Sequence, residues 1–247
     1  MTVWPKTPPI LTPEQLKARE GFMKLWHQVL PKKYGLIEKF NQGYVAQLPL
    51  KKGSVTLEVG AGLGEHAKYE DLGNQEYYCL EYREEFCKEL RKVIFPPERV
   101  LCGDIQKTQK WDAATFDRII AIHVLEHLLD LPAALAEISR LLKPGGVFDV
   151  VIPTEGGFAY SLARKISAER VFRKNFKMDY GPIIKNEHVS TYHEITEVLF
   201  ANFRLQTRSF FPSFLPISGL NLCVGMRLGF APKRRGGKRV GNEKGAI

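Results

Sequence analysis

The sequence has 247 residues, enough for one large α/β domain or for a core domain with an appendage. Hydrophobic residues make up 44% and charged residues 26%, which is typical of a globular protein whose core needs no disulfide bonds. The formal net charge is +9, but six basic residues and one acidic residue lie within 233–247. We therefore predict a disordered basic tail at residues 232–247. It either keeps the protein in solution or makes a peripheral contact with a membrane or an acidic polymer.

Four cysteines are present, at Cys79, Cys87, Cys102 and Cys223. They show neither CxxC pairing nor the spacing of metal ligands, so we expect small, buried, unpaired side chains in a reducing cytosol. The N-terminus lacks a basic segment followed by an apolar run, and no apolar stretch reaches about 18 residues. These features predict a cytoplasmic protein without a secretory signal or a membrane-spanning helix.

Residues 1–50 precede the first predicted core strand and are predicted to form a helical cap or lid. A helix begins at Thr12 and Pro13, where Thr12 caps the first turn and Gln15 completes a capping box. Apolar residues then recur at helical spacing until Pro31 interrupts them. A second helix is predicted between residues 36 and 48.

Predicted strands and helices alternate from residue 51 to residue 231. The strands are expected at 54–59, 77–80, 99–102, 116–122 and 147–152, followed by β-like runs at 203–211 and 221–229. The clearest helix runs from Leu131 to Leu142 and ends at the Lys-Pro-Gly-Gly sequence 143–146. Residues 153–190 break the alternation and are interpreted as an insertion on the substrate side. This order predicts a parallel sheet covered on both faces, with ligands outside the carboxyl ends of the strands.

A glycine-rich turn follows the first predicted strand and reads Glu58-Val59-Gly60-Ala61-Gly62-Leu63-Gly64. Glycines let the backbone turn tightly and approach a ligand closely. Alone, the turn is compatible with a nicotinamide, a flavin or an adenosylmethionine cofactor. The spacing differs from the G-x-G-x-x-G of dinucleotide binders, and a carboxylate at Glu58 suits a cofactor with ammonium and sulfonium groups.

With the segments that follow it, the turn resembles the first motif of class I S-adenosylmethionine-dependent methyltransferases, in particular the small-molecule subgroup called methyltransferase type 11. The resemblance covers about residues 53–152 and continues more weakly to about 230. It implies a Rossmann-like fold with a mostly parallel, seven-stranded sheet. It also implies S-adenosyl-L-methionine as the cofactor and S-adenosyl-L-homocysteine as the product. Residues His66 and Lys68 depart from the family pattern, in which small or hydroxylated residues are common.

The same resemblance assigns cofactor contacts by position in the motifs. Glu81, followed by Tyr82, takes the place of the acidic residue that binds both ribose hydroxyls. Asp104 takes the place of the residue that accepts from the adenine amino group, and Ile105 packs near the adenine. The predicted cofactor-binding residues are Glu58, Gly60, Ala61, Gly62, Gly64, Glu81, Tyr82, Asp104, Ile105, Ile122 and His123.

Methyl transfer from a sulfonium mainly needs alignment and exclusion of water, and an oxygen acceptor also benefits from a general base. His188, which follows the insertion, and His127 are the candidates for this catalytic role. His123 is expected to line the site. No metal is expected, because no cysteine pair or HExxH sequence accompanies these histidines.

The insertion carries six basic residues and one acidic residue between Arg164 and Lys177. Two interpretations stay open: a solvated helix face, or a surface that binds an anionic acceptor such as a phosphate-bearing glycan precursor. The residues predicted to contact the acceptor are Tyr160, Arg164, Arg173 and Tyr180.

The sequence favours O-methylation of a small acceptor, such as an anionic or phosphate-bearing glycan precursor or a natural product, by in-line displacement. N- or C-methylation of a lipid or quinone-like acceptor is the first alternative, and a non-catalytic regulator that binds S-adenosylmethionine is the second. A specific nucleic-acid partner is not expected, since the N/D-P-P-Y/F motif is replaced by Ile122-His123-Val124-Leu125. The sequence does not indicate an oligomeric state.

Overall fold

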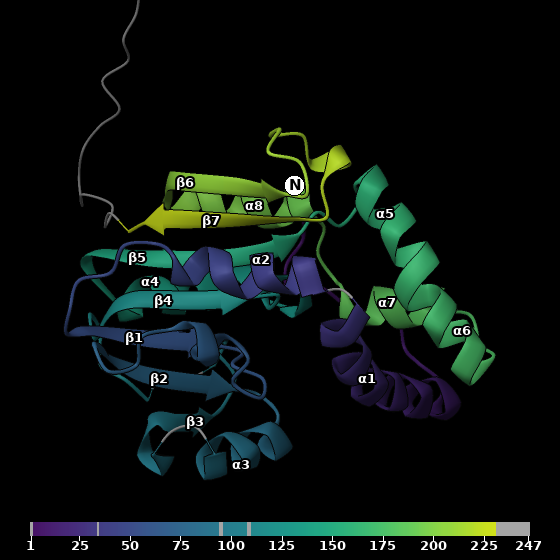
Figure 1. The fold of residues 1–247 in the computed structure, drawn as a ribbon, viewed down its shortest axis with the longest axis horizontal. Helices are drawn as coiled ribbons and strands as arrows, with labels where there is room; N and C mark the ends of the chain where they lie inside the picture. The colour runs from purple at the N-terminus through teal and green to yellow at the C-terminus, as the bar shows by residue number, and fades with distance from the viewer. Residues whose placement is uncertain (1, 34, 94–95, 108–109, 231–247) are drawn as a thin grey trace, which may run out of the picture.

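The structure, a computed structural model, describes residues 2–33, 35–93, 96–107 and 110–230. Its centre is a seven-stranded sheet in the order β3-β2-β1-β4-β5-β7-β6 (Figure 1). The strands are β1 (Ser54–Val59), β2 (Gln75–Glu81), β3 (Val100–Cys102), β4 (Phe116–Ile122), β5 (Leu142–Pro153), β6 (Arg204–Phe211) and β7 (Cys223–Gly229). Adjacent strands are parallel except where β7 pairs with β5 and β6. The predicted α/β fold with a mostly parallel sheet is confirmed.

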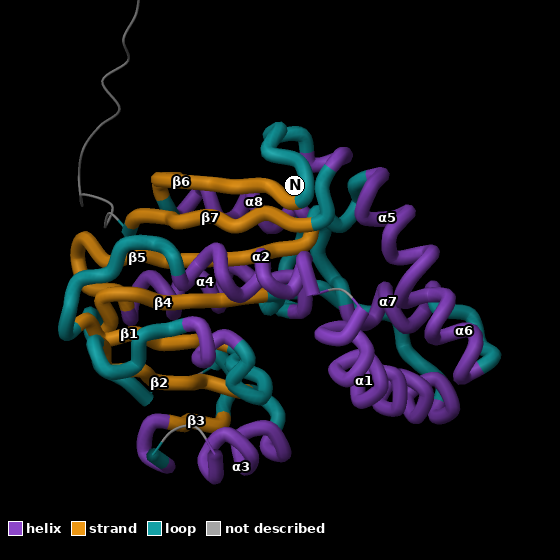
Figure 2. The backbone as a smooth tube through the Cα atoms, in the orientation of Figure 1, coloured by secondary structure: helices purple, strands orange, loops and turns teal. Residues whose placement is uncertain are grey.

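Helices cover both faces of this sheet, which is why its central strands are apolar on both sides (Figure 2). The helices are α1 (Pro13–Lys33), α2 (Gly35–Ala46), α3 (Glu84–Val93), α4 (Leu131–Leu141), α5 (Phe158–Arg164), α6 (Arg170–Phe176), α7 (Gly181–Glu187) and α8 (Tyr192–Asn202). Helices α4 and α8 pack on one face, and α2 and α3 pack on the other. Within the described residues, no helix combines the length and the apolar character that a membrane crossing requires.

Two predicted element boundaries are wrong. Helix α1 continues past Pro31 to Lys33, because a proline near the end of a helix removes one backbone bond without ending the last turn. Strand β5 begins at Leu142, so it contains the Lys-Pro-Gly-Gly sequence predicted as a loop. The pairing with β4 jumps there from Phe116 with Leu142 to Arg118 with Val147, so the extra residues form an irregularity inside the strand.

Helix α1 and the helices of residues 158–187 share a small apolar core of their own. Phe22 of α1 contacts Phe172 of α6 at 5.3 Å between ring centres, and it contacts Tyr180 at 5.5 Å. The buried members of this satellite core are Leu11, Ala18, Phe22, Ala168, Phe172, Tyr180 and Ile183. The N-terminal segment and the segment after β5 therefore pack together beside the carboxyl ends of the strands (Figure 1).

The first ten residues run along the protein rather than away from it. The Lys6 N–H donates to the Leu129 carbonyl at 2.7 Å, and the Lys6 ammonium pairs with Glu194 of α8. Farther along, the Asn186 side chain donates to the Pro9 carbonyl at 3.0 Å. This N-terminal strap (residues 2–11) thus connects the start of α4, the start of α8 and the end of α7.

A buried ion network joins three strands beneath α2. Asp149 of β5 accepts from Arg118 of β4 at 2.7 Å and from Arg227 of β7 at 2.7 Å. Arg118 also pairs with Glu70 at 3.0 Å, and its remaining nitrogen donates to the Val45 carbonyl at the end of α2. Arg118 is 1% exposed and Asp149 is fully buried, so each charge depends on its partners for solvation.

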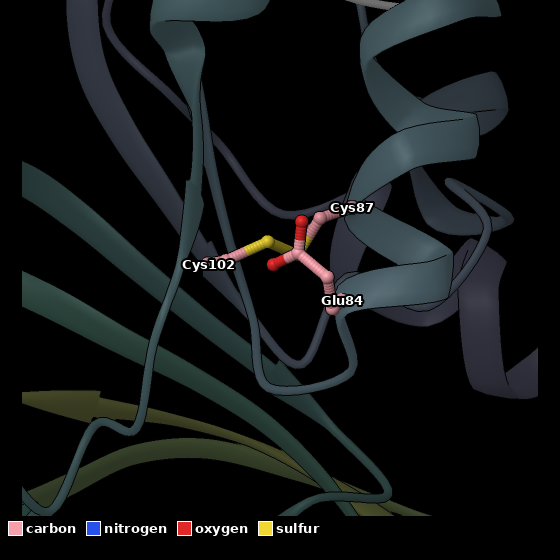
Figure 3. Close-up of side chains that lie close together, drawn as sticks. All are labelled: Glu84, Cys87 and Cys102. Carbon is pink, nitrogen blue, oxygen red and sulfur yellow. A yellow bond between two sulfur atoms is a disulfide. The ribbon is translucent and has the colours of Figure 1, made fainter.

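Two of the cysteines form a disulfide, which corrects the expectation of four unpaired thiols. Cys87 of α3 bonds to Cys102 of β3, and the Glu84 carboxylate lies beside the two sulfur atoms (Figure 3). A pattern of spacing could not show this, because the pair is created by the packing of α3 on an edge strand. Cys79 and Cys223 are free and buried, as expected.

Candidate active site at the carboxyl ends of the strands

The glycine turn leaves β1 with three glycines in the left-handed region, at φ +71° for Gly60, +57° for Gly62 and +81° for Gly64. A side chain at Gly60 would also place its Cβ 2.4 Å from Val124, which lies in the segment after β4. The turn and the β4 end are therefore in close contact, and this contact depends on the bare backbone of Gly60. Ala61 is buried in the core on the α2 side.

Acidic side chains stand at the ends of the next two strands. The Glu81 carboxylate, at the end of β2, accepts the Gly62 N–H at 2.9 Å and the Arg83 N–H at 2.9 Å. Asp104, just after β3, accepts the Gln106 N–H at 2.9 Å, and the Gln106 side chain accepts the Asp130 N–H at 2.7 Å. The fold thus brings Glu81 directly against the glycine turn, and it ties Asp104 to the start of α4.

Three other predicted cofactor residues have different surroundings. Tyr82 is 76% exposed, whereas Ile105 is only 4% exposed and packs in the main core. Ile122 is half-buried at the end of β4.

Glu58 is almost fully buried at the end of β1 and accepts the Tyr77 hydroxyl of β2 at 3.0 Å. Burial raises the pKa of Glu58 to about 7, although His66 and the Tyr77 hydroxyl act in the opposite direction. Its carboxyl group therefore exchanges a proton near neutral pH in the protein without ligand.

His123 follows β4 with φ +53°, a conformation that is uncommon for a residue other than glycine. Its backbone N–H donates to the Val151 carbonyl, and its Nδ1 lies 3.1 Å from Glu126 Oε1. Two buried atoms of this pair, His123 Nε2 and Glu126 Oε2, have no hydrogen-bond partner within the described part of the chain. Burial acts to raise the pKa of Glu126, but the His123 hydrogen bond and neighbouring histidines outweigh it and lower the pKa to about 2.

His127 and His188, the two predicted catalytic residues, meet although 60 residues separate them. Their ring centres lie 4.9 Å apart, and the rings are nearly perpendicular. The backbone holds them there, because the Glu126 carbonyl accepts the N–H groups of Val189 and Ser190. The cluster of histidines therefore lies between the end of β4 and the segment after α7.

Glu155 and Tyr160 complete this cluster. Glu155, two residues after β5, lies 3.0 Å from His188 Nδ1 and pairs on its other oxygen with Arg164. The Tyr160 hydroxyl lies 3.5 Å from the same His188 nitrogen. Burial acts to raise the pKa of Glu155, but its bond to His188 and the charge of Arg164 lower it overall.

The other two predicted acceptor contacts lie elsewhere. Arg173 is an exposed residue of α6 that pairs with Glu169 at 2.8 Å and Asp179 at 3.1 Å. Tyr180 is 6% exposed because its ring packs in the satellite core. Arg173 is therefore engaged with neighbouring acidic residues and Tyr180 with the satellite core, rather than with the histidine cluster.

A cavity of about 210 Å³ opens beside Glu155, between the end of β5 and the start of α8. Phe158, Tyr192 and Ser218 are among the residues that line it. Exposed apolar side chains occur on α5, on the turn that follows it and in the segment between β6 and β7, and α5 and this last segment also supply residues to the cavity. They form the apolar rim, which consists of Phe158, Leu162, Ile166, Phe214, Leu215, Ile217 and Leu220.

Sequence reasoning missed Glu155 and the roles of Glu126 and Gln106. Glu155 had a usable signal, since it follows a predicted buried strand and ligands of such sheets gather at strand ends. Gln106 had none, because its partner Asp130 lies in a different segment, and the backbone bonds of Glu126 to Val189 and Ser190 likewise join segments that are far apart in sequence.

The comparison with known proteins agrees with this geometry. Residues 57–150 match the family model of the methyltransferase domain. A sterol 24-C-methyltransferase of Aspergillus fumigatus is 30% identical over 125 residues, which are 47% of this chain and 32% of that protein. A sterol 24-C-methyltransferase of Neurospora crassa is also 30% identical, over 126 residues. The chain thus spans about a third of the length of these relatives.

Solved structures share the fold. One of them is an S-adenosylmethionine-dependent methyltransferase of Thermotoga maritima, described as a possible histamine N-methyltransferase. It superposes with a TM-score of 0.59 at 20% identity, and the superposition covers 87% of this chain and 99% of the Thermotoga chain. The CurJ carbon methyltransferase superposes with a TM-score of 0.54 at 20% identity. The superposition covers 79% of this chain and 53% of the CurJ chain. Residues 57–150 therefore match a methyltransferase domain, and the chain shares its fold with S-adenosylmethionine-dependent methyltransferases of known structure.

Proposed function

We propose that the chain transfers a methyl group from S-adenosylmethionine to a hydroxyl group of a small acceptor. One observation carries this proposal. The glycine turn with Glu81 and the histidine cluster lie at the same edge of the sheet, and Gly60 touches Val124 between them. A site for the methyl donor and a site for the acceptor are therefore neighbours.

The residues present fit the cofactor. The glycines of the turn let its backbone approach a ligand closely. The Glu81 Oε2 atom accepts one hydrogen bond and keeps a position for a ribose hydroxyl, and a second hydroxyl would replace the 3.3 Å contact of the Arg83 side chain on Oε1. Asp104 stands where it can accept from an adenine amino group. Among the described residues, the buried His123 Nε2 has no hydrogen-bond partner, which is expected of a position that a ligand completes.

When bound, the cofactor supplies a methyl group already activated by a sulfonium. The acceptor oxygen bonds to the methyl carbon as the carbon–sulfur bond breaks, and the acceptor proton must leave. His188 and His127 are the side chains placed to receive that proton, since their Nδ1 atoms are held by Glu155 and by the Glu187 carbonyl. Exclusion of water by the satellite helices would favour the transfer.

The anionic character of the acceptor has weaker support than its hydroxyl group. Arg164 and Arg173 are already paired with acidic residues. Exposed cations between Arg164 and Lys177 for which the described residues provide no ion pair are Lys165, Arg170, Lys174 and Lys177. These four would have to bind a phosphate.

Removal of the Glu81 carboxylate tests the cofactor site. Glu81→Ala should weaken S-adenosylmethionine binding by about ten-fold or more, because a charged acceptor of two hydroxyl donors is lost. Titration calorimetry with S-adenosylmethionine and S-adenosylhomocysteine measures this. Glu85→Ala, on the exposed side of α3, is the matched control and should bind as the wild type does. Equal affinity of the Glu81→Ala protein would refute the ribose assignment.

A second candidate is C-methylation of an apolar, lipid-like acceptor. Its support is the 30% identity to sterol 24-C-methyltransferases and the apolar rim beside the cavity, in which Phe214 is 88% exposed. Incubation with methyl-labelled S-adenosylmethionine and either lipid or polar cell extracts separates the two candidates, since NMR distinguishes O–CH₃ from C–CH₃ products. Cofactor binding without label transfer to any fraction would instead favour the non-catalytic regulator.

A further inference from the structure

Glu126, His127 and His188 form a compact set of potential metal ligands. One ligand atom from each residue can be chosen so that all three lie within 4.8 Å of one another. Ligands in a tetrahedral zinc site are about 3.3 Å apart, given metal–ligand bonds of about 2.0–2.1 Å. Small rotations of the two rings and the carboxylate are enough to close this difference.

The hydrogen bonds of the two histidines occupy Nδ1 of each ring and leave Nε2 available to a metal ion. His127 Nδ1 lies 2.8 Å from the Glu187 carbonyl, and His188 Nδ1 lies 3.0 Å from the Glu155 carboxylate. An acceptor at Nδ1 places the proton on that nitrogen and leaves the lone pair on Nε2. Metal-binding histidines show this same arrangement, in which a carbonyl or carboxylate orients the ring and increases its basicity.

The third ligand is a buried carboxylate with one oxygen unused. Glu126 is 0% exposed, and its Oε1 is held by His123. Its Oε2 has no hydrogen-bond partner among the residues described. An unpaired buried carboxylate oxygen costs free energy unless a cation or donor completes it.

We propose that Glu126, His127 and His188 bind a divalent transition-metal ion, with zinc as the best fit. Two histidines and one glutamate form a ligand set of catalytic zinc sites, which keep the fourth position open for water or substrate. His123, the Glu187 carbonyl and Glu155 act as the outer partners that orient the three ligands. Sequence spacing could not reveal the site, because His188 joins the other two residues only through the fold.

The role of this ion rests on the proposed methyl transfer, whereas its binding does not. An acceptor hydroxyl in the open position would lose its proton to water more easily, because the ion stabilises the alkoxide. His127 and His188 would then serve as ligands rather than as proton acceptors. The oxygen would still form its bond to the methyl carbon as the carbon–sulfur bond breaks.

Metal binding is measured directly on the whole chain stripped with a chelator. We expect one Zn²⁺ per chain by calorimetry and, with Co²⁺ as the probe, the visible absorption of a four- or five-coordinate site. His127→Gln and His188→Gln should each weaken Zn²⁺ binding by more than about 100-fold. His193→Gln, an exposed histidine of α8, is the matched control and should bind like the wild type.

A separate variant excludes the cysteines as the source of binding. The Cys87→Ser/Cys102→Ser protein lacks the Glu84–Cys87–Cys102 cluster, and it should still bind one Zn²⁺. Glu155→Gln should weaken binding by about 10- to 100-fold, as loss of an outer partner does. Cofactor binding, measured in parallel, shows that each variant is folded.

The proposal is overturned if the stripped wild type binds no Zn²⁺ or Co²⁺ while it still binds S-adenosylhomocysteine. It is also overturned if the His127→Gln and His188→Gln proteins keep wild-type affinity for Zn²⁺. Either result would leave the proposed methyl transfer intact. Failure to bind S-adenosylmethionine, with Zn²⁺ binding preserved, would instead contradict the proposed function alone.

Discussion

Glu58 links the stability of the protein to pH at the scale of a single residue. Its pKa of about 7 in the folded chain lies above the ordinary value of 4.5, because burial penalises the charged carboxylate. A raised pKa in the folded state means that this group contributes stability that is fully present below pH 4.5. That contribution is lost as the pH rises through about 7.

Glu58→Gln should remove this dependence, since the amide resembles the protonated carboxyl and can still accept from Tyr77. At pH 8 the variant should be more stable than the wild type by about 3 kcal/mol, and at pH 4 the two should be similar. Urea unfolding at both pH values measures the difference. Glu76→Gln, at an exposed position of the neighbouring strand β2, should change neither value. An equal effect of Glu58→Gln at both pH values would contradict the buried, protonated carboxyl.

The residues of the cofactor side were the ones that the sequence could indicate. Glu58, Glu81 and Asp104 each follow a strand, so the strand pattern alone predicts that they share one edge of the sheet. His127 and His188 were recognised as chemical candidates, but their contact was not predictable. It depends on backbone bonds from Val189 and Ser190 to Glu126, and no local pattern encodes these bonds.

At the scale of elements, the packing of α2 on β7 depends on one missing side chain. A Cβ at Gly225 would lie 2.1 Å from the Tyr44 ring, which is inside any permitted contact. Gly225→Ala should therefore destabilise the protein by about 2 kcal/mol or more, because the helix must move off the sheet. Thermal or urea unfolding measures this.

A control glycine and a double variant make this test specific. Gly219→Ala should be nearly neutral, since a Cβ there meets nothing within 4 Å. The cost of Gly225→Ala should be much smaller when Tyr44 is already alanine, because the clashing ring is gone. Additive effects of the two substitutions would mean that Tyr44 and Gly225 do not constrain each other.

The strands and their order along the chain could be predicted from the sequence, whereas the pairing of distant helices could not. The apolar runs of β1, β4 and β5 are typical of buried parallel strands. The satellite core brings Phe22 against Phe172, 150 residues later, and the helical pattern of each segment says only that it has an apolar face. The choice of partner is made by the chain as a whole.

At the scale of the molecule, Asp149 holds together segments that are far apart in sequence. It pairs with Arg118, which donates to the Val45 carbonyl at the end of α2, and with Arg227, which donates to the Pro49 carbonyl after α2. Asp149→Asn should cost about 3–5 kcal/mol, because it leaves a buried positive charge without compensation. Chemical denaturation at neutral pH measures this cost. Glu89→Gln, which removes an exposed ion pair with Lys92, should cost less than about 1 kcal/mol.

Because of the N-terminal strap, a label or a surface linker has different effects at the start of the strap and at the end of β7. Residues 2–11 are bonded beside the segments that carry His127 and His188, whereas Gly229 pairs with Val147 at the amino end of β5. A fluorophore or a surface linker at Met1 would therefore report on, and disturb, the acceptor side. The end of β7 lies at the opposite edge of the sheet (Figure 1), so a protein immobilised through a group at the end of β7 would keep its site facing the solution.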